Sequence, residues 1–224
     1  MADLSGSVVL VVGATGGLGS LLSQQLEAAG AIVLRSGRTT ATLAADLRDD
    51  SAAATLIEAA AAVHGRLDGL VIAAGVVAFG PASEVSDATL RELFDVNTLA
   101  PVRLVRAATP HLAAAAQSGG APFVVTLSGV VAESPTAGLA AYSASKAALA
   151  AFTQAASREL RRASIRIIDA RPGHTETALS THPLEGTAPA FPAGLAPEAV
   201  AARIVRAIID GEKDLPSGAF SGAS

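Results

Sequence analysis

The chain contains no cysteine and no tryptophan, and tyrosine and methionine occur once each among its 224 residues. The absence of cysteine excludes disulfides, thiolate metal sites and cysteine nucleophiles. Aromatic residues make up only 3% of the sequence and charged residues 16%, whereas half of the residues are hydrophobic. A core must therefore be built from Ala, Val, Leu and Ile. The net charge of −4, with scattered arginines, offers no basic face for nucleic acid.

Long hydrophobic runs and a basic leader are also lacking. No window reaches 18 uninterrupted apolar residues, so no membrane span is expected. The first residues lack the basic segment of a secretory signal. The histidines show no ligand spacing, so no metal site is expected. We expect one cytoplasmic α/β domain with neither a nucleic-acid nor a membrane partner.

Short apolar segments alternate with helical stretches along the chain. This alternation predicts a doubly wound parallel sheet with the strand order 3-2-1-4-5-6. Only seven residues separate Arg38 from Asp46, too few for a crossover helix, so the third strand should be short. The segment 183–197, rich in proline and glycine, is predicted to be a substrate lid, and 216–224 a flexible tail. The expected strands are 7–12, 31–36, a short one ending near 46, 70–74, 123–127 and 165–170.

The first expected strand runs directly into a glycine-rich turn. This turn, Gly13 to Gly19, precedes an apolar helical stretch, Leu21 to Ala29. Glycines let the backbone approach a pyrophosphate, and the free N–H groups and dipole of a helix N-terminus favour its charge. The arrangement predicts a dinucleotide site.

The single tyrosine, Tyr142, stands four residues before Lys146, one of only two lysines. The surrounding alanines favour a helix, on which the two side chains share one face. An ammonium beside a phenol should lower the phenol pKa from about 10 and allow proton exchange with an alcohol or carbonyl oxygen. A surface tyrosine with a solvated lysine is the alternative for this pair alone.

Together, the glycine turn and the Tyr142–Lys146 pair resemble the classical short-chain dehydrogenase/reductase family. The family motif Thr-Gly-x-x-x-Gly-x-Gly is matched at all three glycines, although Val12 replaces the threonine. The resemblance implies one Rossmann-type oxidoreductase domain. It also implies a homodimer or homotetramer paired through the helices Asp87–Gln117 and Ala141–Arg162. The matching residues are Gly13, Gly17, Gly19, Tyr142 and Lys146.

The end of the second strand indicates which nucleotide is bound. An NAD site has an acid there, whereas this chain reads Leu34 to Arg38 with no acid. A guanidinium can bind a 2′-phosphate in bidentate fashion. The resemblance places Arg38 and Ser36 beside that phosphate, so we expect NADP(H) in preference to NAD(H). The alternative is an ordinary solvated arginine.

The resemblance also implies further cofactor contacts. Asp46 and Leu47 correspond to the pair at the adenine, and Thr177, with Thr175 second, to the threonine at the nicotinamide amide. The family's asparagines after strand four are replaced by Ile72 and Ala73. The remaining implied contacts are Thr15, Leu18, Ala74, Gly75, Tyr142, Lys146, Pro172 and Gly173.

For catalysis, the resemblance makes Tyr142 the proton donor or acceptor, with Lys146 lowering its pKa and binding the nicotinamide ribose. Asn97 is assigned a helix kink and a water that links to Lys146. The family serine lies thirteen residues before the tyrosine, which is Gly129 here. Ser128 is one residue earlier, and a one-residue shift in a strand turns a side chain to the opposite face.

A one-residue insertion in the loop 130–138 would restore the register, and we therefore predict Ser128 as the catalytic serine. The alternative is a site without a serine in a slow or inactive protein. The sequence thus predicts hydride transfer between a nicotinamide and a neutral carbonyl or secondary alcohol. A nucleotide-binding sensor or scaffold is the main rival, and an isomerase or dehydratase a weaker one. A Ser128 hydroxyl within about 3 Å of the Tyr142 hydroxyl region would favour the enzyme.

Overall fold

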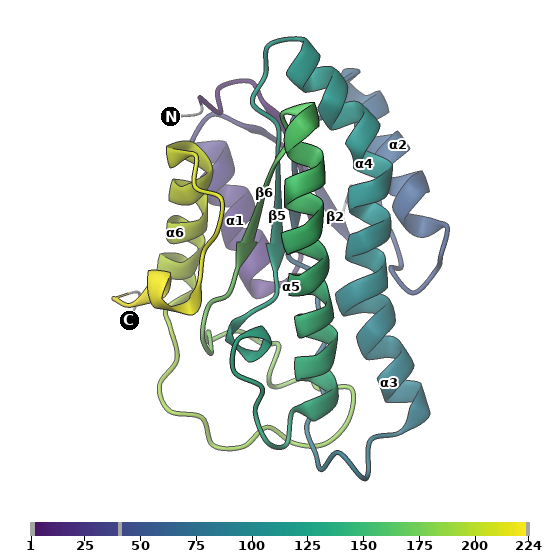
Figure 1. The fold of residues 1–224 in the computed structure, drawn as a ribbon, viewed down its shortest axis with the longest axis vertical. Coiled ribbons are helices and arrows are strands. Elements are labelled where there is room, and N and C mark those ends of the chain that lie inside the picture. Colours follow the sequence, from purple (N-terminus) through teal and green to yellow (C-terminus); the bar gives the residue numbers. More distant parts are fainter. Residues whose placement is uncertain (1–2, 40–41, 223–224) are drawn as a thin grey trace.

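The computed structural model describes residues 3–39 and 42–222. One sheet of six parallel strands, in the order β3-β2-β1-β4-β5-β6, lies between two layers of helices (Figure 1). This confirms the predicted doubly wound sheet and its strand order. The strands are β1 (Val8–Val12), β2 (Ile32–Gly37), β3 (Leu43–Ala44), β4 (Gly69–Ile72), β5 (Phe123–Leu127) and β6 (Arg166–Ala170). The helices are α1 (Gly17–Ala28), α2 (Ala52–His64), α3 (Asp87–Phe94), α4 (Ala100–Gln117), α5 (Ala140–Leu160) and α6 (Pro197–Asp210).

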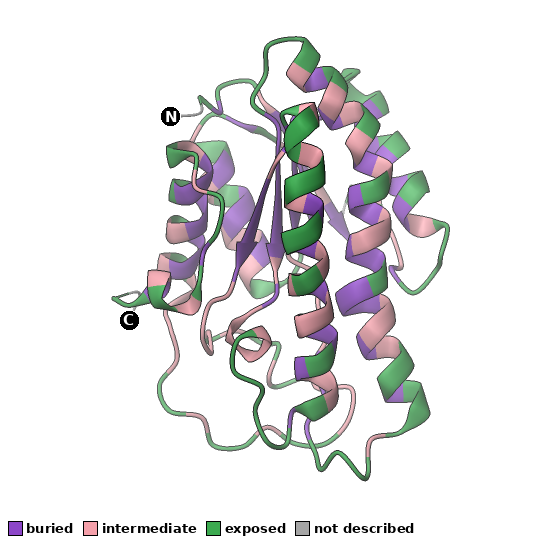
Figure 2. Ribbon diagram, in the orientation of Figure 1, coloured by how far each residue is buried: buried purple, intermediate pink, exposed green. Residues whose placement is uncertain are grey.

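Alternate residues of the central strand β1 belong to two separate hydrophobic cores, one on each face of the sheet. Val9 and Val11 pack with α1 and α6 on one face of the sheet. Val8 and Leu10 pack with α2 and α4 on the other. Every residue of β1 is buried because helices cover both faces, as Figure 2 shows for the strands at the centre of the molecule. Such double coverage explains the uninterrupted apolar run.

The third strand is as short as predicted. Leu43 and Ala44 pair with Ser36 and Gly37, the last two residues of β2. The chain therefore has to return along β2 by only two residues, and a short loop suffices where a full-length parallel neighbour would need a crossover helix. Two residues of that loop, 40–41, lie outside the described part of the chain.

The long helical region is interrupted by a π-helical turn, Asp95–Leu99, between α3 and α4. Pro101 lies in the first turn of α4, directly after this π-helical turn. Asn97, to which the resemblance assigns a helix kink, lies in the middle of the π-helical turn. Such turns are frequent at functional sites.

The C-terminal segment contradicts the prediction of a flexible tail over 216–222. Ser217–Phe220 form a 3-10 turn, and the Phe220 side chain is 2% exposed and packs with α6 in the core. Residues 223–224 of the predicted tail lie outside the described residues. Within the described part of the chain, none of the helices combines the length and the apolar character that crossing a bilayer requires.

Candidate active site

The glycine turn at the end of β1 forms a backbone cradle with no room for side chains. A Cβ on Gly13 would lie 2.5 Å from the Ala74 backbone nitrogen, and one on Gly19 only 2.1 Å from the Gly13 carbonyl oxygen. Gly13 also has a φ of +84°, which glycine adopts without strain. No side chain caps the N-terminus of α1 at Gly16. The first N–H groups of the helix are thus available to an anion, and the cradle fits a dinucleotide pyrophosphate.

The end of β2 presents polar groups beside this cradle. The Ser36 carbonyl accepts hydrogen bonds from the N–H groups of Gly13 and Ala14, which fixes the strand end against the turn. The Ser36 hydroxyl is buried and has no hydrogen-bond partner among the described residues. Arg38 follows immediately and is exposed. An orphaned hydroxyl beside an exposed guanidinium is a donor set that suits a phosphate.

The two residues predicted to contact the adenine, Asp46 and Leu47, differ in how far they are buried. Leu47 packs in the core. Asp46 is half-buried, and its carboxylate accepts hydrogen bonds from the Arg48 guanidinium and backbone N–H. These bonds, together with the charges of Arg48 and Arg38, lower the pKa of Asp46 to about 2. Asp46 is therefore ionised and already partnered in this structure.

The segment after β6 returns to the glycine turn. A Cβ on Gly17 would lie 3.2 Å from the Thr177 side chain, so Thr177 stands directly over the cradle. The Thr175 hydroxyl instead donates to the Gly173 carbonyl at 3.0 Å. Pro172 is tied to the end of β5, because its carbonyl accepts from the Val130 N–H at 2.9 Å. Of the two predicted threonines, Thr177 is the one placed to meet a bound nucleotide. Thr15 is exposed and Leu18 half-buried at the same cradle, and Ala74 and Gly75, both half-buried, follow β4.

Tyr142 and Lys146 lie one turn apart on α5, as the spacing predicted. The Lys146 ammonium is 5.9 Å from the centroid of the Tyr142 ring. The ring is half-buried and packs against an apolar cluster of Val77, Phe79 and Leu139. The Lys146 ammonium donates to the Leu127 carbonyl at the end of β5, at 2.8 Å. The pair therefore stands where β4, β5 and α5 meet.

The expected lowering of the Tyr142 pKa is wrong for this structure. Burial against the apolar cluster raises the pKa of Tyr142 to about 12. Burial also lowers the pKa of Lys146 to about 8, an effect that the charge of Asp169 opposes. Sequence spacing alone hides both effects, because they come from the apolar residues that cover the pair. Tyr142 is a protonated phenol at neutral pH, and its raised pKa makes it a weaker acid than an exposed tyrosine.

Asn97 is fully buried and uses all of its side-chain hydrogen-bonding groups. Its Oδ1 accepts from the Val76 N–H at 2.9 Å, and its Nδ2 donates to the Val76 carbonyl at 2.9 Å and the Ser145 hydroxyl at 3.1 Å. A Cβ on Gly75 would lie 3.2 Å from Asn97 Oδ1 and 3.4 Å from Lys146 Nζ. Asn97 thus joins the π-helical turn to the loop after β4 and to α5, beside Lys146.

The Ser128 hydroxyl has its hydrogen-bond partner on the neighbouring strand β6. This hydroxyl is fully buried and donates to Asp169 Oδ2 at 2.6 Å. Gly129 follows with a φ of +76° and begins the 3-10 turn Val130–Ala132. Ser128 and Thr126, two residues apart, both bond Asp169, because alternate residues of a strand share a face. The Ser128 hydroxyl is therefore bonded to β6 in this structure.

A charged network beside the site was missed by the sequence reading. Arg171, which follows β6, donates to Asp169 at 3.0 Å, to Asp214 at 2.8 Å and to Glu133. These hydrogen bonds hold the pKa of Arg171 above its ordinary value, although burial opposes the shift. The available signal was an aspartate between the apolar residues Ile168 and Ala170 of a strand, since a buried carboxylate requires a partner.

The segment 183–197, predicted as a lid, forms a strap over the Tyr142 cluster. Its Leu184 N–H donates to the Val77 carbonyl, and its Glu185 carbonyl accepts from the Phe79 N–H. Phe191 packs against the same cluster as Tyr142 and stacks on His174, with ring centroids 4.4 Å apart. The strap therefore covers the apolar side of the site.

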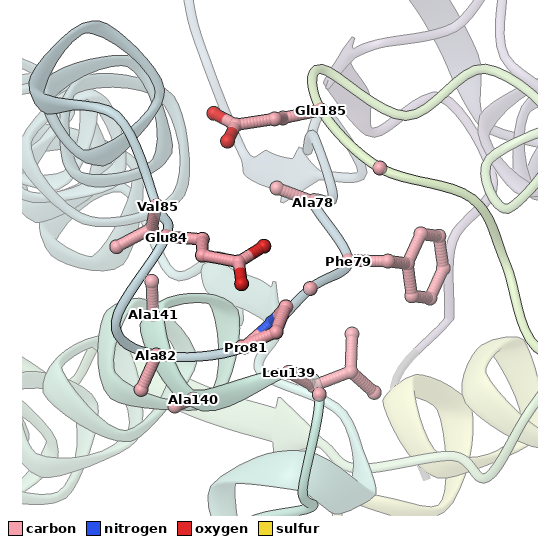
Figure 3. A pocket seen from close by; sticks show the side chains of 13 residues that line it. Ala78, Phe79, Pro81, Ala82, Glu84, Val85, Leu139, Ala140, Ala141 and Glu185 are labelled. Carbon is pink, nitrogen blue, oxygen red and sulfur yellow. The ribbon is translucent and has the colours of Figure 1, made fainter.

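A pocket of about 180 Å³ opens beside the strap (Figure 3). Its walls come from the loop 78–85, the start of α5 and the strap residues Glu185 and Gly186. Phe79 and Leu139 line it and also belong to the cluster that contacts Tyr142. The pocket is thus predominantly apolar, and the carboxylates of Glu84 and Glu185 belong to its lining.

Comparisons with known proteins agree on one family. The short chain dehydrogenase family matches residues 7–186. An uncharacterized oxidoreductase of Methylorubrum extorquens is 32% identical over 195 residues, which cover 79% of this chain and 76% of that protein. The ketoacyl reductase HetN of Nostoc is 28% identical over 225 residues, covering 93% and 77%.

Solved structures show the same fold. A short chain dehydrogenase from Burkholderia cenocepacia in complex with NADP superposes with a TM-score of 0.82 at 26% identity, over 97% of this chain and 99% of that one. A 3-ketoacyl-(acyl-carrier-protein) reductase from Brucella melitensis, complexed with NADH, gives a TM-score of 0.84 at 22% identity, over 96% and 97%. Relatives with this fold thus carry either nicotinamide nucleotide.

Proposed function

The chain belongs to the short chain dehydrogenase family, and on that premise we propose that it is an NADP(H)-dependent reductase of neutral carbonyl compounds. The observation that carries the proposal is the convergence of Tyr142, Lys146 and Asn97 beside an open glycine cradle. A bound nicotinamide would supply or accept the hydride, which no side chain of this protein can do.

The protein's own residues hold and move the proton. Tyr142, whose pKa burial raises to about 12, is protonated at neutral pH and donates to the oxygen of a carbonyl substrate beside the apolar cluster. Lys146 contributes the positive charge that stabilises the phenolate left behind. Asn97 fixes the π-helical turn against the loop after β4 and thereby shapes the space beside Lys146.

The substrate proposal follows from the apolar walls beside Tyr142. The cluster around Tyr142 consists of Val77, Phe79 and Leu139, with Phe191 from the strap. Apolar walls favour a neutral substrate with a hydrocarbon body, whereas an anionic group would meet Glu84 and Glu185 at the pocket. The test is loss of NADPH absorbance with neutral aldehydes, ketones and diketones, compared with carboxylate-bearing analogues of the same size. Turnover of carboxylates alone would contradict the proposal.

The NADP(H) preference is proposed to depend on Arg38. Replacement by alanine should raise the Kd for NADPH by about 10- to 100-fold, because a charge-assisted contact with a phosphate contributes about 1.5–3 kcal/mol. The Kd for NADH should change less than about threefold, since NADH has no 2′-phosphate. Arg35, which lies on β2 three residues before Arg38 and is already paired with Glu27, is the matched control. Equal losses for both nucleotides would contradict this role.

The pKa values predict the pH dependence of reduction. Lys146 is charged below its pKa of about 8 and loses its charge above it. Tyr142 stays protonated up to about 12. The kcat/KM for carbonyl reduction should therefore fall, by up to about tenfold per pH unit, as the pH rises through about 8. A profile that rises over this range would show that a deprotonated group is required.

One observation favours a second function. The Ser128 hydroxyl is bonded to Asp169, and Gly129 occupies the serine position of the family, as would be expected of a nucleotide-binding sensor or scaffold. NADPH binding without turnover of any member of the panel would support that reading.

We also propose pairing of two copies through α4 and α5, which sedimentation at several concentrations would test.

A further inference from the structure

The carboxylate of Asp169 is a charged group that the proposed mechanism leaves unused. Asp169 lies on β6 between the buried Ile168 and Ala170 and is only 5% exposed. It faces Thr126 of β5 in the strand pairing. A carboxylate among apolar neighbours costs several kcal/mol unless it is paired and hydrogen-bonded, so its position requires an explanation.

Three donors hold this carboxylate in one orientation. Oδ1 accepts from the Thr126 hydroxyl at 2.9 Å. Oδ2 accepts from the Ser128 hydroxyl at 2.6 Å and from the Arg171 guanidinium at 3.0 Å. Two of the donors are on β5 and its end, the segment whose Leu127 carbonyl accepts from Lys146. The carboxylate is thus fixed on the same side of the sheet as α5.

The network carries more negative than positive charge. Arg171 is shared by Asp169, Asp214 and Glu133, so three carboxylates share one guanidinium. Glu133 also accepts from the Ser217 hydroxyl. These groups line a hollow beside α5, the helix that carries Lys146. Because part of the lining is buried, its charges are weakly screened by solvent.

Lys146 has no carboxylate partner of its own among the described residues, and its ammonium, 6% exposed, bonds a neutral carbonyl. We propose that Asp169 is a positioning residue that acts through Lys146, because its carboxylate holds Ser128 and the carbonyl of the adjoining Leu127 holds the Lys146 ammonium, so that a fixed negative charge stands next to the residue that Lys146 bonds. Burial lowers the pKa of Lys146, and Asp169 is the charge that opposes this effect. The inference rests on the proposed function only for what the charged Lys146 does in turnover.

The other groups around Lys146 do not supply this charge. Its own helix contributes the protonated Tyr142, and the π-helical turn contributes the uncharged Asn97. The network beyond Asp169 contributes Glu133, Arg171, Asp214 and Lys213, all of which line the hollow. Asp214 is 59% exposed and therefore largely screened by water. Asp169 is the buried carboxylate of the set.

The chain has only two lysines, so lysine-labelled protein gives two ammonium titrations that NMR can separate. Lys213→Arg assigns them. We expect Asp169→Asn to lower the pKa of Lys146 by at least about one pH unit, a tenfold change in its protonation ratio. Asp214→Asn, the matched control, should leave it within about 0.3 unit, because that charge is exposed. An unchanged Lys146 pKa in folded Asp169→Asn protein would overturn the proposal.

A second variant covers the case in which Asp169→Asn does not fold. Arg171→Gln removes the guanidinium that offsets Asp169, so the pKa of Lys146 should rise instead of fall. If the pKa of Lys146 did not rise in Arg171→Gln, that result would also contradict the proposal. This titration needs neither cofactor nor substrate, so its failure is distinct from a failure of the proposed reductase function. If the reductase function and the role of Asp169 are both correct, the fall of kcat/KM with pH should move to lower pH in Asp169→Asn. The size of this move should equal the change in the pKa of Lys146.

Discussion

Replacement of Tyr142 by phenylalanine is expected to lower kcat for carbonyl reduction by about 10²- to 10⁴-fold, the contribution of a positioned general acid. Phenylalanine keeps the ring that packs on Val77, Phe79 and Leu139 and removes only the hydroxyl. The Kd for NADPH should stay within about threefold, because the phosphates and ribose meet other groups. Stopped-flow or steady-state loss of NADPH absorbance would measure the effect.

The control measurements separate a chemical effect from a folding effect. Because the chain has no tryptophan, the fluorescence of bound NADPH can be followed without interference from a protein indole. The unfolding temperature of Tyr142→Phe should match that of the parent to within about 4 °C, about 1–2 kcal/mol for a chain of this size. Turnover within about tenfold of the parent would remove Tyr142 from the proton transfer and return attention to the sensor alternative.

The sheet and the placement of Tyr142 beside Lys146 could be predicted from the sequence because both depend on local patterns. The apolar run Val8–Val12, the glycine turn and the Tyr142–Lys146 spacing each belong to one contiguous segment. The short β3 followed from loop length alone. The kink at Asn97 was expected from an asparagine within a helical region, although the π-helical turn that forms it was not.

The Ser128 orientation and the Asp169 network depend on a contact between β5 and β6. The two residues are 41 apart in sequence and are brought together by the strand pairing Thr126 to Asp169. A short-range pattern cannot show that Asp169 will accept the serine hydroxyl. The same reasoning applies to the Tyr142 pKa, which depends on a cluster drawn from the loop after β4 and on the strap. Local spacing predicts where the Tyr142 phenol lies, whereas contacts between distant segments determine its pKa.

Replacement of Gly19 by alanine is expected to destabilise the protein and to weaken NADPH binding together. The new Cβ would lie 2.1 Å from the Gly13 carbonyl oxygen and 2.8 Å from the Gly13 carbonyl carbon. Both are backbone atoms that cannot turn away, so α1 and the glycine turn must separate. Alanine gains up to about 1 kcal/mol over glycine in a helix, but overpacking of this kind costs about 1–3 kcal/mol and occasionally more.

The 2.1 Å approach puts the clash at the upper end of that range, so we expect a net loss of about 1–2 kcal/mol and a fall in unfolding temperature of about 2–8 °C. The Kd for NADPH should rise at least about tenfold, because the displaced backbone includes the N–H groups that face the pyrophosphate. Gly16→Ala in the same turn is the matched control. Its Cβ would lie 3.4 Å from the same oxygen, an ordinary contact, so its unfolding temperature should fall less than about 3 °C. If Gly19→Ala and Gly16→Ala lost equal unfolding temperature and affinity for NADPH, the turn would exclude side chains for reasons other than this clash. If both variants kept the parent values, α1 would be able to move away from β1 without cost.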